Sequence, residues 1–253
     1  MNAQALNPEV LSTTLENLDR EISRIKACKC ETELDTLLRA MLGRFAVESY
    51  LFVSLRRTEA SRESFRCLIG CSPTWCQLYM AKKWFAIDPF IDHALHNSRP
   101  IALSDIKAET AGQAELLRTA NQHGFRSGMI FPAHAASKST IGVLYLGSTQ
   151  CPDEIEPLLH HNRNLFRTMA LELFEWWEEK AHAETLVRYQ LDKIDVQLLQ
   201  LEQEGYTADE SAKVCGFTTS AVNGRFRRIN DKLDVHHKKR ALERAVELGI
   251  LRR

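Results

Sequence analysis

Apolar side chains recur along the chain at spacings that separate helices from strands. Residues 8–46 carry leucine, isoleucine and methionine at three- and four-residue intervals, which predicts helix. The same periodicity predicts helices over residues 74–85, 108–123 and 153–186. A further short helix is expected to begin at Asp88-Pro89, because proline suits the first helical turn.

Between these helices lie shorter runs rich in aliphatic and aromatic residues, which are typical of strands. They cover residues 49–57, 65–70, 128–134 and 140–147. The order of elements is not a repeated strand-helix-strand pattern. We therefore expect an α/β/α sandwich around an antiparallel sheet of about five strands.

The last part of the chain has only helical patterns, over residues 192–203, 208–214, 220–233 and 238–248. Gly205 suits the end of the first of these helices, and Thr207 with Glu210 forms a capping box for the second. A glycine-containing turn at 215–217 joins the second and third helices, which is a helix-turn-helix pattern. We expect two domains, residues 1–186 and 187–253, with the all-α four-helix unit as the second.

Charge divides the chain in the same way. The 253 residues contain 33 Lys and Arg against 33 Asp and Glu, so the formal charge is zero. Residues 213–253 nevertheless contain eleven basic and four acidic side chains, a net charge of +7, and the rest of the chain carries −7. A basic helical module attached to an acidic body points to nucleic-acid binding by the module.

Other function classes find little support in the sequence. No run of about 18 apolar residues predicts a membrane span, and the polar, acidic N-terminus does not resemble a signal peptide, so we expect a cytoplasmic protein without membrane contact. The phosphate-loop, dinucleotide-binding and nucleophile-elbow motifs are absent. The seven cysteines lack zinc-finger spacing and are expected to be inert thiols. We predict no enzyme activity, no catalytic residues, no metal and no cofactor.

The helical module carries a specific resemblance. It is similar to the C-terminal domain of LuxR-type transcription regulators along all four helices. The matching residues are Gly205, Thr207, Glu210, Ser211, Ala212, Phe217, Thr218, Ala221, Val222, Asn223, Ile229, Lys232, Leu233, Asp234, Val235, Ala241, Leu242, Gly249, Ile250 and Leu251. The family usually has threonine at Ala221, histidine at Arg225 and arginine at Lys238, which leaves the DNA target open.

The resemblance implies double-stranded DNA as a partner, read by the helix at 220–233. Asn223 and Arg227 are one turn apart and are the candidates for base contacts, since Asn pairs well with adenine and Arg with guanine. The remaining candidates are expected to contact phosphates and set the register. They are Thr218, Thr219, Arg225, Arg228, Lys232 and Lys238.

The body resembles the acyl-homoserine lactone-binding domain of quorum-sensing regulators. The matching pattern is Trp75-x3-Tyr79-x8-Asp88-Pro89, followed by the glycines of HGFRSGMIFP at 123–132. The resemblance implies that Trp75 donates to the lactone carbonyl, Tyr79 to the acyl carbonyl, and that Asp88 accepts from the amide. Without it, Trp75 and Tyr79 would be core aromatics and Asp88 a helix cap.

Two positions depart from that family's pattern. Leu103 stands where the family usually has a second tryptophan, and Tyr145 where it usually has a small hydroxyl residue. Both are expected to line the pocket, with Phe52, Leu55 and Leu144 as further wall candidates. The ligand is expected to be an acyl-homoserine lactone; another small molecule, or a cavity filled by Tyr145 and Leu103, are the alternatives.

Taken together, the sequence predicts a quorum-sensing transcription regulator controlled by a small-molecule autoinducer. We expect a homodimer, which would bind a twofold-symmetric operator of roughly 20 base pairs. The predicted dimer contact is an apolar stripe on the long helix: Leu165, Phe166, Met169, Leu173, Phe174 and Trp177. The alternatives are a ligand-independent regulator and an antagonist that forms heterodimers with a related regulator.

Overall fold

The computed structural model describes residues 18–56, 64–134 and 140–251. The chain divides into two compact units, the first ending at Trp176 and the second beginning at Trp177. The division falls inside helix α7 (Arg163–Arg188). Each unit has its own apolar core and is described separately.

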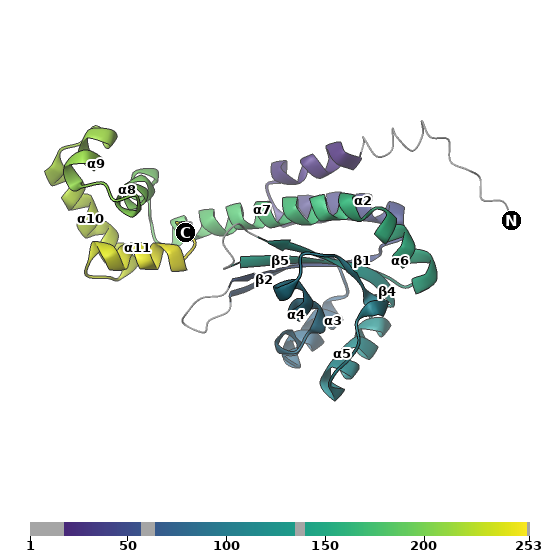
Figure 1. The fold of residues 1–253 in the computed structure, drawn as a ribbon. Helices are drawn as coiled ribbons and strands as arrows, with labels where there is room; N and C mark the ends of the chain where they lie inside the picture. The colour runs from purple at the N-terminus through teal and green to yellow at the C-terminus, as the bar shows by residue number, and fades with distance from the viewer. Residues whose placement is uncertain (1–17, 57–63, 135–139, 252–253) are drawn as a thin grey trace. The chain divides into compact units, whose positions relative to one another are not determined.

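The first unit is built on a five-stranded antiparallel sheet in the order β2-β1-β5-β4-β3 (Figure 1). The strands are β1 (Ser49–Arg56), β2 (Ser64–Ile69), β3 (Ile101–Ala102), β4 (Ser127–His134) and β5 (Thr140–Ser148). The expected α/β/α sandwich with about five strands is thus confirmed. The fifth strand, β3, is only two residues long, which is too short for a hydrophobic pattern to indicate it.

Helices cover both faces of this sheet (Figure 1). One face carries α2 (Glu31–Leu42), α6 (Pro152–His161) and the first part of α7. The other carries α3 (Pro73–Ala81), α4 (Pro89–His96) and α5 (Ala111–Gln122). Because side chains alternate along a strand, β1 and β5 supply residues to two separate apolar layers, and only the layer under α3, α4 and α5 encloses the cavity described below.

Two predicted helices are interrupted. The helix expected over 8–46 begins outside the described residues; it is helical at 18–23 and resumes as α2, with Cys28–Cys30 between. At this break the Cys28 carbonyl accepts from the Trp176 indole at 2.7 Å and the Lys29 N–H donates to Glu33 at 2.8 Å, so these backbone groups find partners outside a helix. The helix expected over 153–186 is divided into α6 and α7 at Asn162, whose side-chain amide bonds the Leu158 carbonyl at 2.9 Å.

The apolar stripe on α7 does not form the exposed surface that we expected. Phe166 packs within 5.4 Å of the Phe131 ring of β4, and Phe174 lies against Gly142 of β5. Of the stripe, only Leu165 is not fully buried. Phe166 and Phe174 are therefore not free to meet a second copy as predicted, because the first unit's own sheet covers them.

Gly128 in β4 is required by the sheet. Its φ of +148° is unfavourable for other residues, and a Cβ atom there would lie 1.9 Å from the Leu146 carbonyl oxygen of β5. The second glycine of the pattern at 123–132 thus has a physical reason, the close approach of β4 and β5.

The second unit contains the end of α7 and, as predicted, four further helices around one apolar core. They are α8 (Lys193–Gln203), α9 (Ala208–Cys215), α10 (Thr219–Leu233) and α11 (Lys238–Glu247). Val222, Phe226, Ile229 and Leu233 of α10 are all buried. Gly216 has a left-handed backbone and turns the chain between α9 and α10.

Candidate functional site

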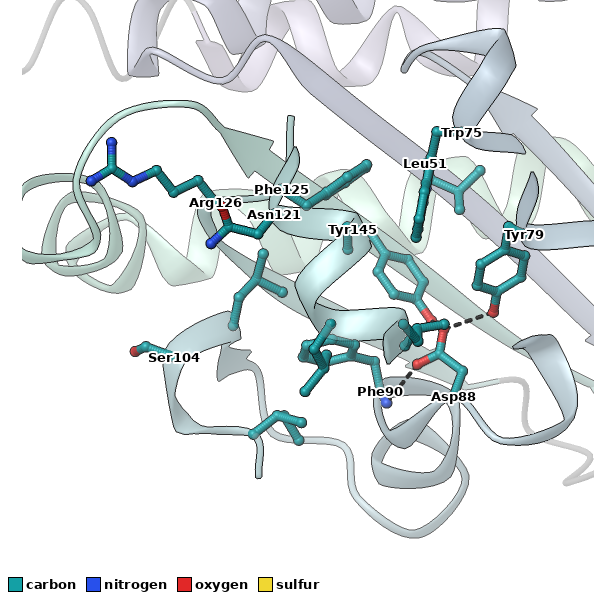
Figure 2. Close-up of a pocket in the computed structure, with 15 residues that line it drawn as sticks. Leu51, Trp75, Tyr79, Asp88, Phe90, Ser104, Asn121, Phe125, Arg126 and Tyr145 are labelled. Carbon is teal, nitrogen blue, oxygen red and sulfur yellow. Dashed lines mark hydrogen bonds between the residues drawn. The ribbon is translucent and has the colours of Figure 1, made fainter. Parts of the chain in front are cut away.

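The first unit contains a cavity of about 260 Å³ between the sheet and helices α3, α4 and α5 (Figure 2). Its wall includes all five residues predicted to bind a ligand: Trp75, Tyr79, Asp88, Leu103 and Tyr145. Ten further residues complete the lining: Leu51, Phe90, Ser104, Ile106, Leu116, Leu117, Ala120, Asn121, Phe125 and Arg126. The cavity is mostly apolar and has a few polar groups, as small-molecule sites commonly have.

Asp88 is the polar centre of this cavity. It caps α4, where its Oδ1 accepts from the Phe90 N–H at 2.8 Å. Its Oδ2 accepts from the Tyr79 hydroxyl at 2.7 Å and from the Tyr145 hydroxyl at 3.4 Å. Figure 2 shows both phenols directed at this carboxylate. Three donors from three different elements therefore meet on one buried acid.

Burial sets the protonation of this cluster. It raises the pKa of Asp88, because the charged carboxylate is removed from water, while the hydrogen bonds that it accepts oppose that rise. Burial also raises the pKa of Tyr79 and of Tyr145, and the adjacent carboxylate adds to it. Both phenols consequently stay neutral and can donate their protons to Asp88.

Trp75 stands beside this cluster in an aromatic group. Its ring lies 5.8 Å from that of Tyr79, one helical turn further along α3, and 5.6 Å from that of Trp84. The His123 ring stacks on it at 5.7 Å and the Phe125 ring lies at 6.2 Å. These neighbours restrict the indole to one orientation on the cavity wall.

Leu103 lies at the start of a short 3-10 helix, Leu103–Asp105, which follows β3. The next residue, Ser104, binds Glu156 of α6 through its hydroxyl and through its N–H at 3.2 Å. Glu156 also accepts from the Gly128 N–H at 3.3 Å. A buried carboxylate thus fixes the segment that brings Leu103 to the cavity.

The three further wall candidates do not line the cavity. Phe52 and Leu144 point to the opposite face of the sheet, since they alternate with Leu51 and Tyr145, which face the cavity. Leu55 packs against the same apolar cluster without lining the cavity. The register of β1 and β5 decides this, and the sequence alone did not reveal which face would meet the ligand.

The sequence analysis also missed the part of the cavity furthest from Asp88. Asn121, Arg126 and Ser104 lie there (Figure 2), and each is largely exposed. The amphipathic pattern of 108–123 predicted a helix, but it gave no indication that Leu116, Leu117 and Ala120 would face a ligand site.

In the second unit both helices of the helix-turn-helix begin at a threonine cap, and the first of these caps was predicted. Thr207 and Glu210 form a capping box at α9. Thr218, rather than Thr219, caps α10 and accepts from the Ala221 N–H at 3.2 Å. Thr219 donates its hydroxyl to Asp209 at 2.5 Å and so ties α10 to α9.

The exposed side of α10 carries Asn223, Arg227 and Arg228. Within the described ranges 18–56, 64–134 and 140–251, no hydrogen bond or ion pair of these three side chains occurs. They lie opposite the buried side of the helix and are available to an external partner.

Arg225 and Lys232 have a different environment. The Arg225 guanidinium bonds Asp192 at 2.8 Å and the buried Asp195 at 2.7 Å, and the Lys232 ammonium bonds Asp195 at 2.7 Å. Asp192 in turn caps α8 in a capping box with Asp195. This network joins α10 to the start of α8. The Asp192 carboxylate offsets the positive charge of Arg225 on its exposed side.

Lys238 is also paired within its unit. Its ammonium lies 3.4 Å from the Glu202 carboxylate and 4.2 Å from the centre of the Phe226 ring. Sequence reasoning found these three cations but missed Asp192, Asp195 and Glu202. The capping-box spacing of Asp192 and Asp195 was visible in the sequence, whereas their pairing with residues 30 or more positions away was not.

Comparison with known proteins adds the decisive observation. Residues 31–176, more than half of the chain, match the Autoinducer binding domain family. The chain belongs to this family. The match covers every residue of the cavity. It ends at Trp176, so the autoinducer-binding domain and the first unit end at the same residue.

Similarity to transcriptional activator proteins extends into the second unit. The chain is 24% identical to the transcriptional activator protein AhyR of Aeromonas hydrophila over 231 residues, 85% of each protein. It is 26% identical to the transcriptional activator protein PhzR of Pseudomonas fluorescens over 228 residues, 81% of this chain and 90% of PhzR. The expected LuxR-type transcription regulator is thereby confirmed, and these relatives are regulators rather than enzymes.

Solved structures support the fold. SdiA of Escherichia coli matches with a TM-score of 0.62 at 16% identity, over 94% of this chain and 98% of SdiA. CepR2 of Burkholderia cenocepacia, described as an N-acylhomoserine lactone-dependent LuxR family factor, matches with a TM-score of 0.53 at 20% identity, over 65% of this chain and 95% of CepR2. Among the residues that the structure describes, no helix is long and apolar enough to cross a membrane.

Proposed function

We propose that this autoinducer-binding protein takes up a small molecule in the Asp88 cavity and, in response, binds DNA through α10. The observation that carries the proposal is the placement of Trp75, Tyr79 and Asp88 together on the wall of one mostly apolar cavity. Such a wall offers polar groups to a ligand head and apolar surface to a chain.

An acyl-homoserine lactone fits this chemistry. The Trp75 indole N–H and the Tyr79 hydroxyl are donors for its carbonyl oxygens, and Asp88 is an acceptor for its amide N–H. Tyr145 changes how such a ligand could bind. Its hydroxyl and that of Tyr79 already donate hydrogen bonds to Oδ2 of Asp88. A lactone amide would have to displace one phenol from the carboxylate, so we expect Tyr145 to limit which lactones bind.

On the DNA side we assign base contacts to Asn223 and Arg227 and phosphate contacts to Thr218, Thr219 and Arg228. The α10 side chains of Asn223, Arg227 and Arg228 are exposed. Arg225, Lys232 and Lys238 each have an acidic partner within the second unit. We propose that these three mainly hold α10 in place and contribute less to phosphate binding than the sequence suggested.

We further propose that the protein acts in the cytoplasm as a homodimer on a twofold-symmetric DNA site. Phe166 and Phe174 of the α7 stripe are covered by the first unit's own sheet, so the contact between copies would use other residues. A chain that forms heterodimers with a related regulator, and blocks it, is the competing reading of the same two units.

The test is DNA selection followed by matched substitutions. The full chain is used to select a binding site from random duplex DNA, and affinities are then measured for Asn223→Ala, Arg227→Ala and the control Arg240→Ala, an exposed arginine of α11. We expect each α10 variant to lose about 1–3 kcal/mol of specific binding and the control to change little. Equal losses, or no selected site, would contradict the assignment of α10 and favour the heterodimer reading.

A further inference from the structure

Two thiols lie in contact beside the ligand cavity. The sulfur atoms of Cys71 and Cys76 are 3.5 Å apart, and both residues are partly accessible to solvent. The sequence analysis treated all seven cysteines as inert, because no pair has a recognised spacing. The structure places this pair together through local geometry.

The start of α3 explains the contact. Ser72 is the N-cap and Pro73 the first helical residue, so Cys71 immediately precedes the cap and Cys76 is the fourth residue of the helix. Side chains at these two positions commonly touch and fix the direction in which the chain enters a helix. Cys71 is itself held, because the preceding Gly70 bonds the Tyr50 carbonyl of β1 at 3.0 Å.

From this geometry we propose that Cys71 and Cys76 form a reversible oxidation site, at which a hydroperoxide closes a disulfide across the start of α3. A disulfide needs a sulfur separation of about 2.05 Å, so the two sulfurs have to approach by roughly 1.5 Å. Both thiols are free, and rotation about the two Cα–Cβ bonds can supply much of that approach.

The reaction balances with the hydroperoxide as the oxidant. The Cys76 thiolate attacks the peroxide oxygen and gives a sulfenic acid and an alcohol, or water when the oxidant is hydrogen peroxide. The Cys71 sulfur then attacks the Cys76 sulfur, the S–S bond forms and water leaves. Two electrons pass from the thiols to the peroxide, and a dithiol reductant reverses the bond.

The order of attack follows from the surroundings of the two thiols. The pKa of Cys76 is lowered from its ordinary value, since Cys71 can donate its S–H to the Cys76 sulfur, whereas that same contact and, after it, burial raise the pKa of Cys71. Cys76 also lies in the first turns of α3, where the helix N-terminus favours a thiolate. We therefore assign Cys76 as the attacking and Cys71 as the resolving thiol.

The site is coupled to the cavity through α3. Cys76 directly follows Trp75 and precedes Tyr79 by three residues, and both of these line the cavity. Cys71 and Cys76 pack against the same apolar cluster as these aromatics. A bond between the thiols would restrain the helix that carries both aromatic wall residues.

The test oxidises the reduced full-length protein with hydrogen peroxide and maps its peptides by mass spectrometry. Cleavage after Arg66 and Lys82 leaves Cys67, Cys71 and Cys76 on one peptide, so the mapping is repeated in Cys67→Ser. We expect this peptide to lose two hydrogen atoms in both proteins and to regain them with dithiothreitol. In Cys71→Ser, dimedone should label Cys76, whereas in Cys76→Ser it should leave Cys71 unlabelled.

The restraint on α3 has its own readout, which needs no substitution. Hydrogen exchange of the wild-type amides over residues 73–81 is expected to be slower in the oxidised than in the reduced protein. A disulfide that disappears in Cys67→Ser, or oxidation that passes to sulfinic acid without a disulfide, would overturn the proposal. Unchanged exchange over α3 would overturn the coupling to the cavity. None of these outcomes depends on whether the cavity binds a lactone.

Discussion

Asp88 has two roles, cap of α4 and acceptor for two phenols, and substitutions can separate them. Asp88→Ala removes both. Losing the cap costs about 1 kcal/mol, and leaving the buried Tyr79 hydroxyl without its 2.7 Å acceptor costs about 1–3 kcal/mol. The 3.4 Å bond from Tyr145 adds a smaller amount. We expect the free energy of unfolding of the first unit to fall by about 2–5 kcal/mol.

Asp88→Asn is the matched change. The asparagine oxygen can still cap α4, since asparagine and aspartate are equally good caps, and its amide group can bond the phenol oxygens. The substitution also removes a buried charge, whose desolvation raises the pKa of Asp88. We expect the free energy of unfolding to change by no more than about 1 kcal/mol.

Urea unfolding followed by tryptophan fluorescence measures this difference mainly in the first unit, because three of the four tryptophans, Trp75, Trp84 and Trp176, lie in it. With a slope of about 2 kcal/mol per molar urea, the alanine variant should unfold at a urea concentration roughly 1–2.5 M lower than the wild type. Equal midpoints for the alanine and asparagine variants would refute the reasoning. The result also decides which variant is suitable for ligand assays, since an unfolded Asp88→Ala protein would lose binding because it has lost its fold and not because it has lost a ligand contact.

Three further changes test other parts of the structure. Because the pKa of Asp88 is raised, its contribution to stability is complete below its ordinary pKa of about 3.9 and is lost as the pH rises through the raised value. In urea titrations at several pH values, the wild type should therefore lose stability relative to Asp88→Asn over that window. A difference that stays constant with pH would contradict this. Gly128→Ala should cost at least about 4 kcal/mol and yield little folded protein, whereas Gly43→Ala, with no atom within 4 Å of the added Cβ, should express normally. Asp195→Ala should destabilise the second unit by about 2 kcal/mol, as measured by thermal circular dichroism. This is less than the roughly 3–5 kcal/mol of a fully buried pair, because the Arg225 and Lys232 side chains remain 22% and 28% exposed. A cost near zero would show that the network is not needed.

Much of the fold could be predicted because local signals agree with the final packing. The four strands found by their aliphatic and aromatic runs are β1, β2, β4 and β5. The caps at Asp88, Thr207 and Thr218 follow from short-range hydrogen bonds, which sequence spacing describes well. These features need no knowledge of distant residues.

The predictions that failed depend on residues that are far apart in the sequence. Whether α7 faces its own sheet or a second copy depends on Phe131 and Gly142, which lie elsewhere in the chain. The break at Cys28–Cys30 depends on Trp176, 148 residues from Cys28. Phe52 and Leu144 were assigned to the wrong face, since a strand's pattern shows that its faces differ but does not show which one meets the ligand.

The candidate site was predictable in its centre and less so at its edge. Trp75, Tyr79 and Asp88 were found by the resemblance to the acyl-homoserine lactone-binding domain, and all line the cavity. The hydrogen bond from Tyr145 to Asp88 joins residues 57 positions apart and has no local signal. The same holds for the acidic partners of Arg225 and Lys232, which changed our assignment of the DNA contacts.

Thermal unfolding of the full chain against a panel of acyl-homoserine lactones tests the central claim most directly, with wild type, Tyr145→Phe and Tyr145→Ser compared. A lactone at 100 times its dissociation constant stabilises the folded protein by about 2.7 kcal/mol, which is roughly 5–10 °C for a chain of this size. We predict such a shift for at least one lactone, larger in Tyr145→Phe because Asp88 is released, and for longer or bulkier lactones in Tyr145→Ser because space is added. A flat panel for all three folded proteins would contradict a lactone site in the Asp88 cavity.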